Sequence, residues 1–418
     1  MRIRFFGGAH EVGRSAILVE DDRNIMLDYG IKIDHEPEFP VGTPKVDACV
    51  ISHAHLDHSG SAPALYNESP VATFGTMPTL RLSSLLLEDS IKISHRNHTK
   101  LNYHNRQLGL FKSRFISMDY HERAGFGNYD ITLYDAGHIS GSAITLLERA
   151  KGRENRRIVY TGDFKLSPQT LHRGAEVVKS DVLIIESTYA TREHTDRKKL
   201  IADFVDKIKE TLDNNGTALI PTFAVGRAQE LLAILEQNGL AERTYVDGMA
   251  REASRIALSH PSFIENADML SAAVKNATFI EMPGMRKEVL DGPSIILTPA
   301  GMLNGGPVLD YIGRLRRDSH IFITGYQVEG TNGRNLVETG KIDIDGRREH
   351  VRTPFSVYDF SAHAGKSDLY KYVRDSAPNT VICVHGDPKN TEAFANELKG
   401  EGFDAHAPKV GDSIELAG

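Results

Sequence analysis

The segment Ser52-His53-Ala54-His55-Leu56-Asp57-His58 constrains this chain more than any other feature, because it places three imidazoles and a carboxylate within a few residues. It directly follows an apolar run that ends at Ile51. In an extended loop, alternate side chains point to the same side, so His53, His55 and Asp57 can converge. His58 can then turn to a second centre. Imidazole and carboxylate are ligands that suit zinc, and no helical His-Glu-x-x-His pair opens the segment. It predicts half of a two-metal site; the alternative is a histidine-rich surface loop.

Later segments supply further residues of the same types at the ends of short apolar runs. Runs rich in Val and Ile are typical of strands, and those that end on such residues are Asn24–Asp28, Ile131–His138, Arg157–Asp163, Asp181–Glu186 and Val381–His385. Strand ends that all carry metal-binding or acid/base groups indicate one site along one edge of a sheet. His138 and Asp163 would complete a four-coordinate zinc ion, and the second oxygen of Asp163 could bridge to another ion. Taken singly, each of these two residues would more often be structural, and it is their order and setting that favour a metal site.

The region from about 190 to 345 has a different pattern, in which strand-like and helix-like segments alternate. Thr217–Phe223 predicts a strand, 226–236 the helix after it, and Ser294–Thr298 and His320–Thr324 two more strands. This βα pattern is typical of a parallel sheet. Because metal-binding residue types resume only afterwards, at His363 and His385, we expect this second α/β domain to interrupt the first.

Composition sets the outer limits on function. The 418 residues, 40% hydrophobic and 25% charged, are those of an ordinary globular protein of two to three domains. No stretch is long and apolar enough for a membrane span, and no signal peptide opens the chain, so we expect a cytoplasmic protein. Cys49 and Cys383 lie in apolar runs and are interpreted as reduced core residues.

The net charge of −7 argues against a chain that coats nucleic acid through bulk positive charge, but it leaves room for a local basic groove. Candidate segments for such a groove are 92–106, 153–157 and 314–317. A solvated surface is the alternative for each of them.

The ordered set of Asp28, the His53-to-His58 segment, His138 and Asp163 resembles the metallo-β-lactamase superfamily. Three later motifs resemble its nucleic-acid-processing β-CASP branch: Glu186-Ser187-Thr188-Tyr189, Phe360-Ser361-Ala362-His363-Ala364-Gly365 and Val384-His385-Gly386-Asp387. Segments 221–227, 299–303 and 325–331 are similar to RNA nucleases of the cleavage and polyadenylation specificity factor type. The resemblance covers nearly the whole chain. It implies an α/β fold, a metallo-β-lactamase αββα sandwich (1–190 and 346–418) with an inserted α/β β-CASP domain (191–345).

The resemblance also implies roles for the site residues. One Zn²⁺ would be held by His53, His55, His138 and Asp163, and a second by Asp57, His58, Asp163 and His385. Asp28 would support a metal-binding histidine from behind. A water between the two ions would attack phosphorus, with Asp57, Glu186 and His363 in catalytic roles. His363 would protonate the leaving ribose oxygen, and Glu186 would keep it protonated; a core histidine is the alternative.

Substrate and partners follow from the same resemblance. A histidine at position 385 favours RNA, since the branch members that act on DNA carry an apolar residue there. The glycine-rich segment near Gly330, with Arg227 from an earlier motif, could contact phosphate, although such a turn is weak support by itself. The residues concerned are Arg227, Gly330, Thr331, Gly333 and Arg334.

We therefore expect a zinc-dependent ribonuclease with two ions per chain that cuts single-stranded RNA, with no membrane partner. Whether it is an endonuclease or a 5′-to-3′ exonuclease stays open, as does a homodimer. Two alternatives remain: a catalytically inactive RNA-binding scaffold, which would typically have lost metal ligands, and a non-nuclease hydrolase of the same fold, which would need neither the inserted domain nor His363.

Overall fold

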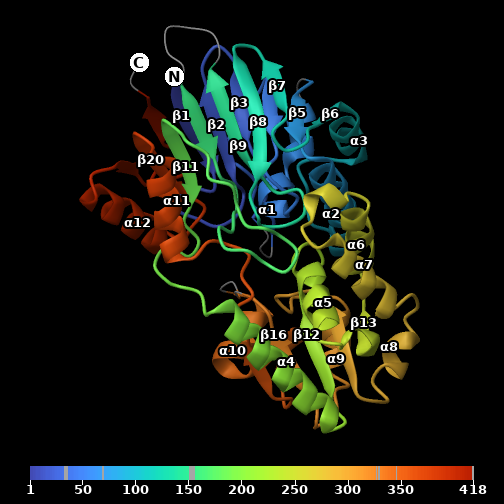
Figure 1. Cartoon of the computed structure of the whole chain (residues 1–418). Helices are drawn as coiled ribbons and strands as arrows, with labels where there is room; N and C mark the ends of the chain where they lie inside the picture. Colours follow the sequence, from blue (N-terminus) through green and yellow to red (C-terminus); the bar gives the residue numbers. More distant parts are fainter. Residues whose placement is uncertain are drawn as a thin grey trace. The chain divides into compact units, whose positions relative to one another are not determined.

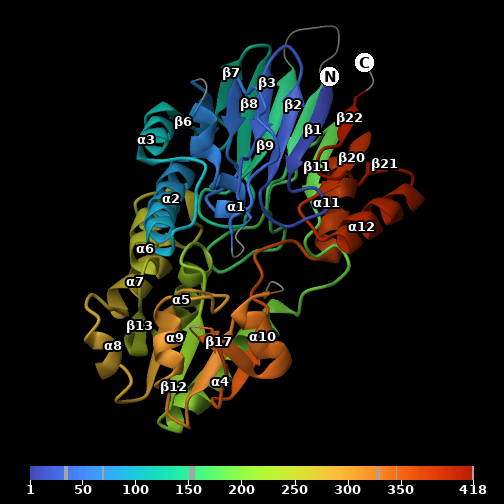
Figure 2. The same cartoon turned by 180° about the vertical axis from the view of Figure 1, so that it is seen from behind.

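The computed structural model describes residues 1–32, 36–67, 70–149, 156–325, 327, 330–344 and 346–416. The chain forms two compact units, which appear in two views in Figures 1 and 2. Unit 1 consists of Met1–Pro168, Arg173–Glu193 and His363–Gly418, and unit 2 of Gln169–His172 and His194–Ala362.

Unit 1 contains two seven-stranded sheets. The first has the order β22 (Ser413–Glu415), β1 (Arg2–Gly7), β2 (Ala16–Glu20), β3 (Asn24–Leu27), β4 (Ala48–Val50), β5 (Ala72–Gly75) and β6 (Phe115–Ser117). The second has the order β21 (Asp404–His406), β20 (Thr380–Val384), β11 (Val182–Glu186), β10 (Arg157–Tyr160), β9 (Ala143–Arg149), β8 (Tyr129–Asp135) and β7 (Arg123–Phe126).

The strands of both sheets are apolar on both faces, and this explains the layering of unit 1. In β2, Ile17 and Val19 pack in the core between the sheets, whereas Leu18 belongs to the cluster on the outer face. Because side chains alternate along a strand, each sheet can bury two faces. α2 (Met77–Asn97) and α3 (Asn105–Arg114) cover the outer face of the first sheet, and α11 (Lys366–Ser376) and α12 (Pro388–Gly400) that of the second. The result is the predicted αββα sandwich.

Unit 2 is built on one sheet with the order β14 (Thr278–Phe279), β13 (Thr244–Val246), β15 (Ser294–Thr298), β12 (Thr217–Pro221), β16 (His320–Ile323) and β19 (Phe355–Val357). Neighbouring strands are parallel. α4 (Arg197–Asp213), α5 (Arg227–Gln237), α6 (Ala250–Leu258) and α7 (Ala267–Asn276) supply one apolar cluster. α9 (Pro307–Ile312) and α10 (Asn332–Thr339) supply another, next to α8 (Met285–Glu288) and the hairpin of β17 (Lys341–Ile344) and β18 (Arg347–His350). This is the parallel α/β domain expected from the sequence.

The layered fold with an inserted α/β domain confirms the predicted fold class, while the predicted boundaries at 190 and 345 stay predictions. Several strands end earlier than the sequence predicted. β3 ends at Leu27 and β20 at Val384, each one residue before its predicted end. The next residues, Asp28 and His385, have φ values of 59° and 47°, in the left-handed region. Such a residue turns the chain out of the sheet and ends the strand there.

The expectation for the two cysteines is met. Cys49 and Cys383 are buried and free. Within the described residues, no helix combines the length and apolar character needed to cross a bilayer.

A buried carboxylate ties a short segment, Gln169–His172, into unit 2. Glu230 in α5 accepts hydrogen bonds from the backbone N–H groups of Thr170 at 2.6 Å and Leu171 at 3.0 Å. Arg197 at the start of α4 also donates to it. Burial favours the neutral acid, but Arg197 and the other donors outweigh burial and hold the pKa of Glu230 below its ordinary value. This stabilisation is present at neutral pH and is lost as the pH falls through that lowered pKa.

We predict that Glu230→Ala destabilises unit 2 by about 3–5 kcal/mol, because it leaves the Arg197 guanidinium and two backbone N–H groups without their acceptor. Glu230→Gln keeps an acceptor oxygen and should lose less. Chemical denaturation at neutral pH measures the effect, with the exposed Glu242→Ala as a control expected to stay within about 0.5 kcal/mol of the parent. Equal unfolding midpoints for the Glu230 and Glu242 variants would contradict the assignment.

Candidate metal centre

The histidines and carboxylates singled out in the sequence meet in unit 1, at the ends of strands from both sheets. Asp28 follows β3, His138 follows β8, Asp163 follows β10 and His385 follows β20. The segment after β4 leads into the short helix α1 (Leu56–Ser59), which lies at the ends of the strands in Figures 1 and 2. Strands that end on one edge therefore bring together side chains that are far apart in the sequence.

The first donor set consists of His53, His55, His138 and Asp163. The Nδ1 atom of His55 lies 3.2 Å from the Nε2 atoms of both His53 and His138. Asp163 Oδ2 lies 3.5 Å from His53 Nε2 and 3.8 Å from His138 Nε2. Four tetrahedral ligands at about 2.0–2.1 Å from a zinc ion lie about 3.3–3.4 Å from one another. The spacing of these four atoms therefore fits a single zinc ion.

The second donor set consists of Asp57, His58, Asp163 and His385. Asp163 contributes its other oxygen here: Oδ1 lies 3.1 Å from His58 Nε2 and 3.2 Å from His385 Nδ1. His385 Nε2 lies 3.4 Å from Asp57 Oδ2. Three of these buried atoms, His58 Nε2, Asp163 Oδ1 and His385 Nε2, have no well-formed hydrogen bond within the described residues. Burying polar atoms without partners is costly, so the set is suited to a cation.

The charge state of the centre agrees with metal binding. Burial favours the neutral acid, but the surrounding histidines hold the pKa of Asp163 well below its ordinary value, so it is ionised. Burial, together with the neighbouring His58, lowers the pKa of His53, which leaves it as neutral imidazole. Both are the protonation states that bind metal. For His58, burial is outweighed by Asp163, Asp57 and Asp28, which raise its pKa. The same carboxylates would attract a cation placed at its Nε2.

Asp28 is fully buried behind the donors and is completely hydrogen-bonded. Its Oδ2 lies 2.7 Å from each of three groups: His58 Nδ1 and the hydroxyls of Ser52 and Tyr160. Its Oδ1 accepts from the Ser52 backbone N–H, also at 2.7 Å. Holding His58 at Nδ1 leaves Nε2 directed toward the second donor set, and such contacts orient and tune metal ligands.

Glu186 and His363 form a pair beside the first donor set. His363 Nδ1 lies 3.0 Å from Glu186 Oε2 and 3.9 Å from Asp163 Oδ2. Glu186 also accepts from the Phe164 backbone N–H at 2.9 Å, and Lys165 Nζ donates to the His363 carbonyl at 2.9 Å. Burial disfavours the imidazolium of His363, but Glu186 and Asp163 outweigh burial and raise its pKa to about 9. His363 keeps 21% of its side chain exposed, whereas Glu186 keeps 1%, so the histidine is the member of the pair that a substrate can reach.

The sequence gave no role to some residues of the centre, although two of them, Ser52 and Thr188, stand inside its motifs. Ser52 and Tyr160 hold Asp28, Thr161 Oγ1 accepts from the Glu186 backbone N–H at 3.2 Å, and Thr188 Oγ1 lies 3.4 Å from His385 Nδ1. Their one signal in the sequence is position, since each lies within three residues of a residue that was singled out. Which of the donor atoms bind metal stays a prediction.

The residues predicted to contact phosphate all lie in unit 2. Thr331 caps α10 and accepts from the Arg334 backbone N–H, Gly330 has a φ of 82°, and the Gly333 N–H donates to the Met302 carbonyl at 2.8 Å. Arg334 forms an ion pair with Glu338 on its own helix, and Arg227 donates to the Thr324 carbonyl. These contacts are those of a capped helix and a strand end, and the phosphate role stays a prediction.

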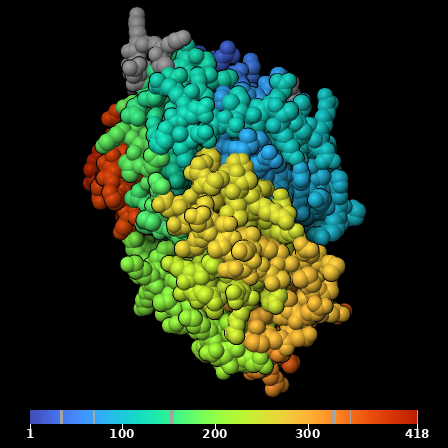
Figure 3. Space-filling model, turned by 45° about the vertical axis from the view of Figure 1, so that its right-hand side comes forward, coloured from blue at the N-terminus to red at the C-terminus, as the bar shows by residue number. Residues whose placement is uncertain are grey.

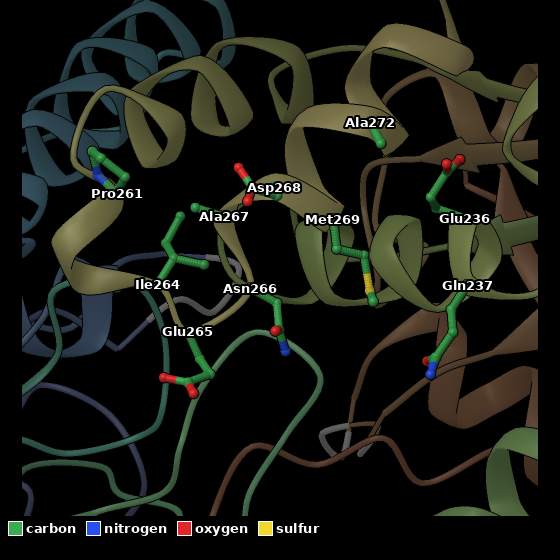
Figure 4. Close-up of a pocket in the computed structure, with 10 residues that line it drawn as sticks. All are labelled: Glu236, Gln237, Pro261, Ile264, Glu265, Asn266, Ala267, Asp268, Met269 and Ala272. Atoms are coloured by element: carbon green, nitrogen blue, oxygen red, sulfur yellow. The ribbon is translucent and has the colours of Figure 1, made fainter.

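A surface depression of about 730 Å³ lies in unit 2, whereas the metal-binding donor sets lie in unit 1. Figure 4 shows its lining, which includes Glu236 near the end of α5, Glu265 just before α7 and Asp268 in the first turn of α7. None of its lining residues belongs to the donor sets. Three carboxylates would repel a phosphate group, so this depression is a poor candidate for binding nucleic acid.

Comparison with known protein families gives three matches along the chain. Residues 8–212 match "Anti-Pycsar protein Apyc1", residues 228–336 match "Beta-Casp domain", and residues 348–408 match "Zn-dependent metallo-hydrolase RNA specificity domain". The third match includes both His363 and His385.

Curated relatives resemble the whole chain. The probable RNase MJ4 of Methanocaldococcus jannaschii is 38% identical over 100% of both chains. RNase aCSPSF2 of Saccharolobus solfataricus is 35% identical over 99% of this chain and 85% of its own. Transcription termination factor FttA of Thermococcus kodakarensis is 33% identical over 100% of this chain and 71% of its own. A crystal structure of a protein of unknown function from Enterococcus faecalis, 15% identical, has the same fold with a TM-score of 0.62 over 99% of each chain.

We predict that Asp28→Asn weakens metal binding by about 10–100-fold, because the amide turns its N–H₂ toward groups that now donate to a carboxylate. The loss should be confined to the ion nearer His58. Competition for zinc with a fluorescent chelator measures it. Tyr160→Phe is the matched control, since it removes one donor to Asp28 but keeps the contact between Asp28 and His58. If both variants hold two ions as tightly as the parent, Asp28 does not position His58.

Proposed function

Because the chain belongs to the β-CASP ribonuclease family of zinc-dependent metallo-hydrolases, we propose that it hydrolyses phosphodiester bonds in single-stranded RNA. The observation that supports this most is the pair of donor sets that share Asp163, with His363 and Glu186 beside them. Each part has a place in phosphodiester hydrolysis.

The first ion would be held by His53, His55, His138 and Asp163, and the second by Asp57, His58, Asp163 and His385. Zinc in both sites would lower the pKa of a water molecule and neutralise charge that develops on the phosphate. Asp163 would then keep the two sites together through its two oxygens, because each oxygen faces a different donor set. Asp28 would keep His58 in the orientation that presents Nε2.

His363 would donate a proton to the leaving ribose oxygen. Its position supports this role, since its ring is partly exposed and hydrogen-bonded to Glu186 on one side. Glu186 would hold the ring in place and stabilise the imidazolium, and it is itself fixed by the Phe164 N–H. A positioned general acid contributes about 10²–10⁴-fold to such a reaction.

RNA as substrate is supported by the match of residues 348–408 to an RNA specificity domain and by relatives named as ribonucleases. The full donor sets argue against a catalytically inactive scaffold, and the pairing of Glu186 with His363 argues against a non-nuclease hydrolase. Internal cutting and 5′-to-3′ trimming both fit these residues. The cytoplasmic location and a homodimer stay predictions.

The test is incubation of the zinc-loaded protein with 5′-labelled, 5′-monophosphorylated single-stranded RNA, with products resolved on a sequencing gel. We expect cleavage that a chelator abolishes: discrete labelled fragments for an endonuclease, or labelled mononucleotide from the start for a 5′-to-3′ exonuclease. Asp163→Ala is the matched inactive variant and should lose metal and activity together. Intact RNA with both ions bound would refute the proposed function.

We predict that His363→Ala keeps both zinc ions and lowers kcat by about 10²–10⁴-fold, because only the proton donor is removed. Zinc content and single-turnover rates measure the two effects separately. His121→Ala is a suitable control, since this histidine is exposed in unit 1 and lies outside the centre. Unchanged turnover by the His363 variant at every pH would eliminate it as the general acid.

A further inference from the structure

One stretch of unit 1 has a charge opposite to that of the chain as a whole. Between Asp89 and Asp119 the sequence contains six Lys or Arg residues, three histidines and no acidic residue, in a chain of net charge −7. We define the basic turn as the seven basic residues around the connection between α2 and α3: Lys92, His95, Arg96, His98, Lys100, His104 and Arg106. All seven are exposed. The cyan surface at the right of Figure 3 includes this part of the chain.

The Lys and Arg side chains of the basic turn have no acidic partner within the described residues, and Arg96 only donates a long hydrogen bond of 3.5 Å to its neighbour Asn97. Lys112, further along α3, forms an ion pair with Glu88, but within the described residues Lys92, Arg96, Lys100 and Arg106 form none. Arg96 is placed favourably near the C-terminal end of α2, where a helix attracts positive charge. Arg106 lies in the first turn of α3, where the helix dipole disfavours a cation, and no acidic residue is present in that turn. Stabilisation of the helices therefore does not explain the whole cluster.

α2 fixes the distance from the basic turn to the metal centre, because both lie in unit 1. The N-cap residue of α2, Thr76, donates to the Gly141 carbonyl at 2.7 Å, and Thr79 donates to the same oxygen at 2.9 Å. Gly141 lies in the loop that carries His138. From Thr76 the helix rises about 1.5 Å per residue, so Lys92 lies about 24 Å and Arg96 about 30 Å along its axis from this anchor.

We propose that the basic turn is a second RNA-binding surface, which holds the phosphate backbone of a single strand some distance from the scissile bond. This inference rests on the proposed function. Four unpaired exposed cations complement a polyanion, and local positive charge is needed where the whole chain would repel one. Phosphate contacts carry no sequence preference, so the surface would favour long substrates over short ones whatever their sequence.

The test compares two double variants with the same change in charge. Lys92→Gln with Arg96→Gln removes two unpaired cations from exposed positions one helical turn apart. Lys371→Gln with Arg374→Gln, on α11, removes a similarly exposed Lys and Arg that are paired with Asp375 and Glu401. Affinity for a long oligoribonucleotide is measured by fluorescence anisotropy on zinc-loaded protein carrying His363→Ala, with a gel to check that the RNA stays intact. KM for the long RNA and for a trinucleotide is measured in the otherwise unaltered enzyme.

We expect the Lys92/Arg96 variant to lower the slope of log affinity against log salt by about 1.4, since each phosphate contact with a single strand contributes about 0.7. Between 50 and 200 mM salt the parent would then lose about sevenfold more affinity than the variant. KM for the long RNA should rise at low salt, and KM for the trinucleotide, which is too short to reach the basic turn, should not. The Lys371/Arg374 variant should match the parent.

An unchanged salt slope in the Lys92/Arg96 variant, or equal losses in both double variants, would overturn the proposal. An acidic protein or an anionic membrane as the true partner would give the first result. Failure of the proposed function has a different signature, since it would abolish cleavage of the long RNA and the trinucleotide alike. Anisotropy would still decide whether the basic turn binds RNA.

Discussion

The buried carboxylates at the strand ends are the constraint on which the rest of unit 1 depends. Asp28 and Asp163 are buried after strand ends, and the partly exposed Asp57 of α1 lies beside them. Within the described residues, buried side-chain atoms of His58, Asp163 and His385 in this cluster have no well-formed hydrogen bond. Ionised groups this deeply buried persist only beside opposite charge or donors. Two seven-stranded sheets position these carboxylates. The left-handed conformations of Asp28 and His385 turn the chain toward the cluster after β3 and after β20. The fold therefore accepts backbone strain and buried charge in one place, and a cation there would neutralise the charge.

The sequence predicted the parts of this arrangement that depend on residue type and order. Short apolar runs predicted the strands, and the polar residues at their ends predicted one site along a sheet edge. The two layers and the complete donor sets were implied by the family resemblance, and relatives along the whole chain confirm that family. The sequence could not predict where the strands end, because no residue pattern shows that Asp28 adopts a left-handed conformation. Nor could the sequence assign roles to Ser52 and Tyr160. The contact of Ser52 with Asp28 depends on the pairing of β3 with β4, and that of Tyr160 depends on how the second sheet packs on the first.

The aromatic residues show a similar limit. For Tyr189, Phe223 and Tyr326 the sequence favours buried rings over platforms on which RNA bases stack. Tyr189 is buried, but Phe223, just after β12, is 40% exposed. Tyr326 lies outside the described residues.

The residues of unit 2 suggested for phosphate contact also have ordinary roles in helix caps and at strand ends. A glycine-rich turn and an arginine satisfy a helix terminus and a phosphate equally, so their spacing alone cannot separate the two.

The first and last strands of unit 1 are neighbours: Arg2 on β1 faces Glu415 on β22, which lies 413 residues later in the chain. During synthesis on the ribosome, β1 therefore has an unpaired edge until nearly all of the sequence printed here has emerged. His385, which the second donor set requires, also emerges late. For most of its translation, the nascent chain therefore carries an open sheet edge and a metal centre that lacks one of its donors, and an open edge of this kind can pair with other chains.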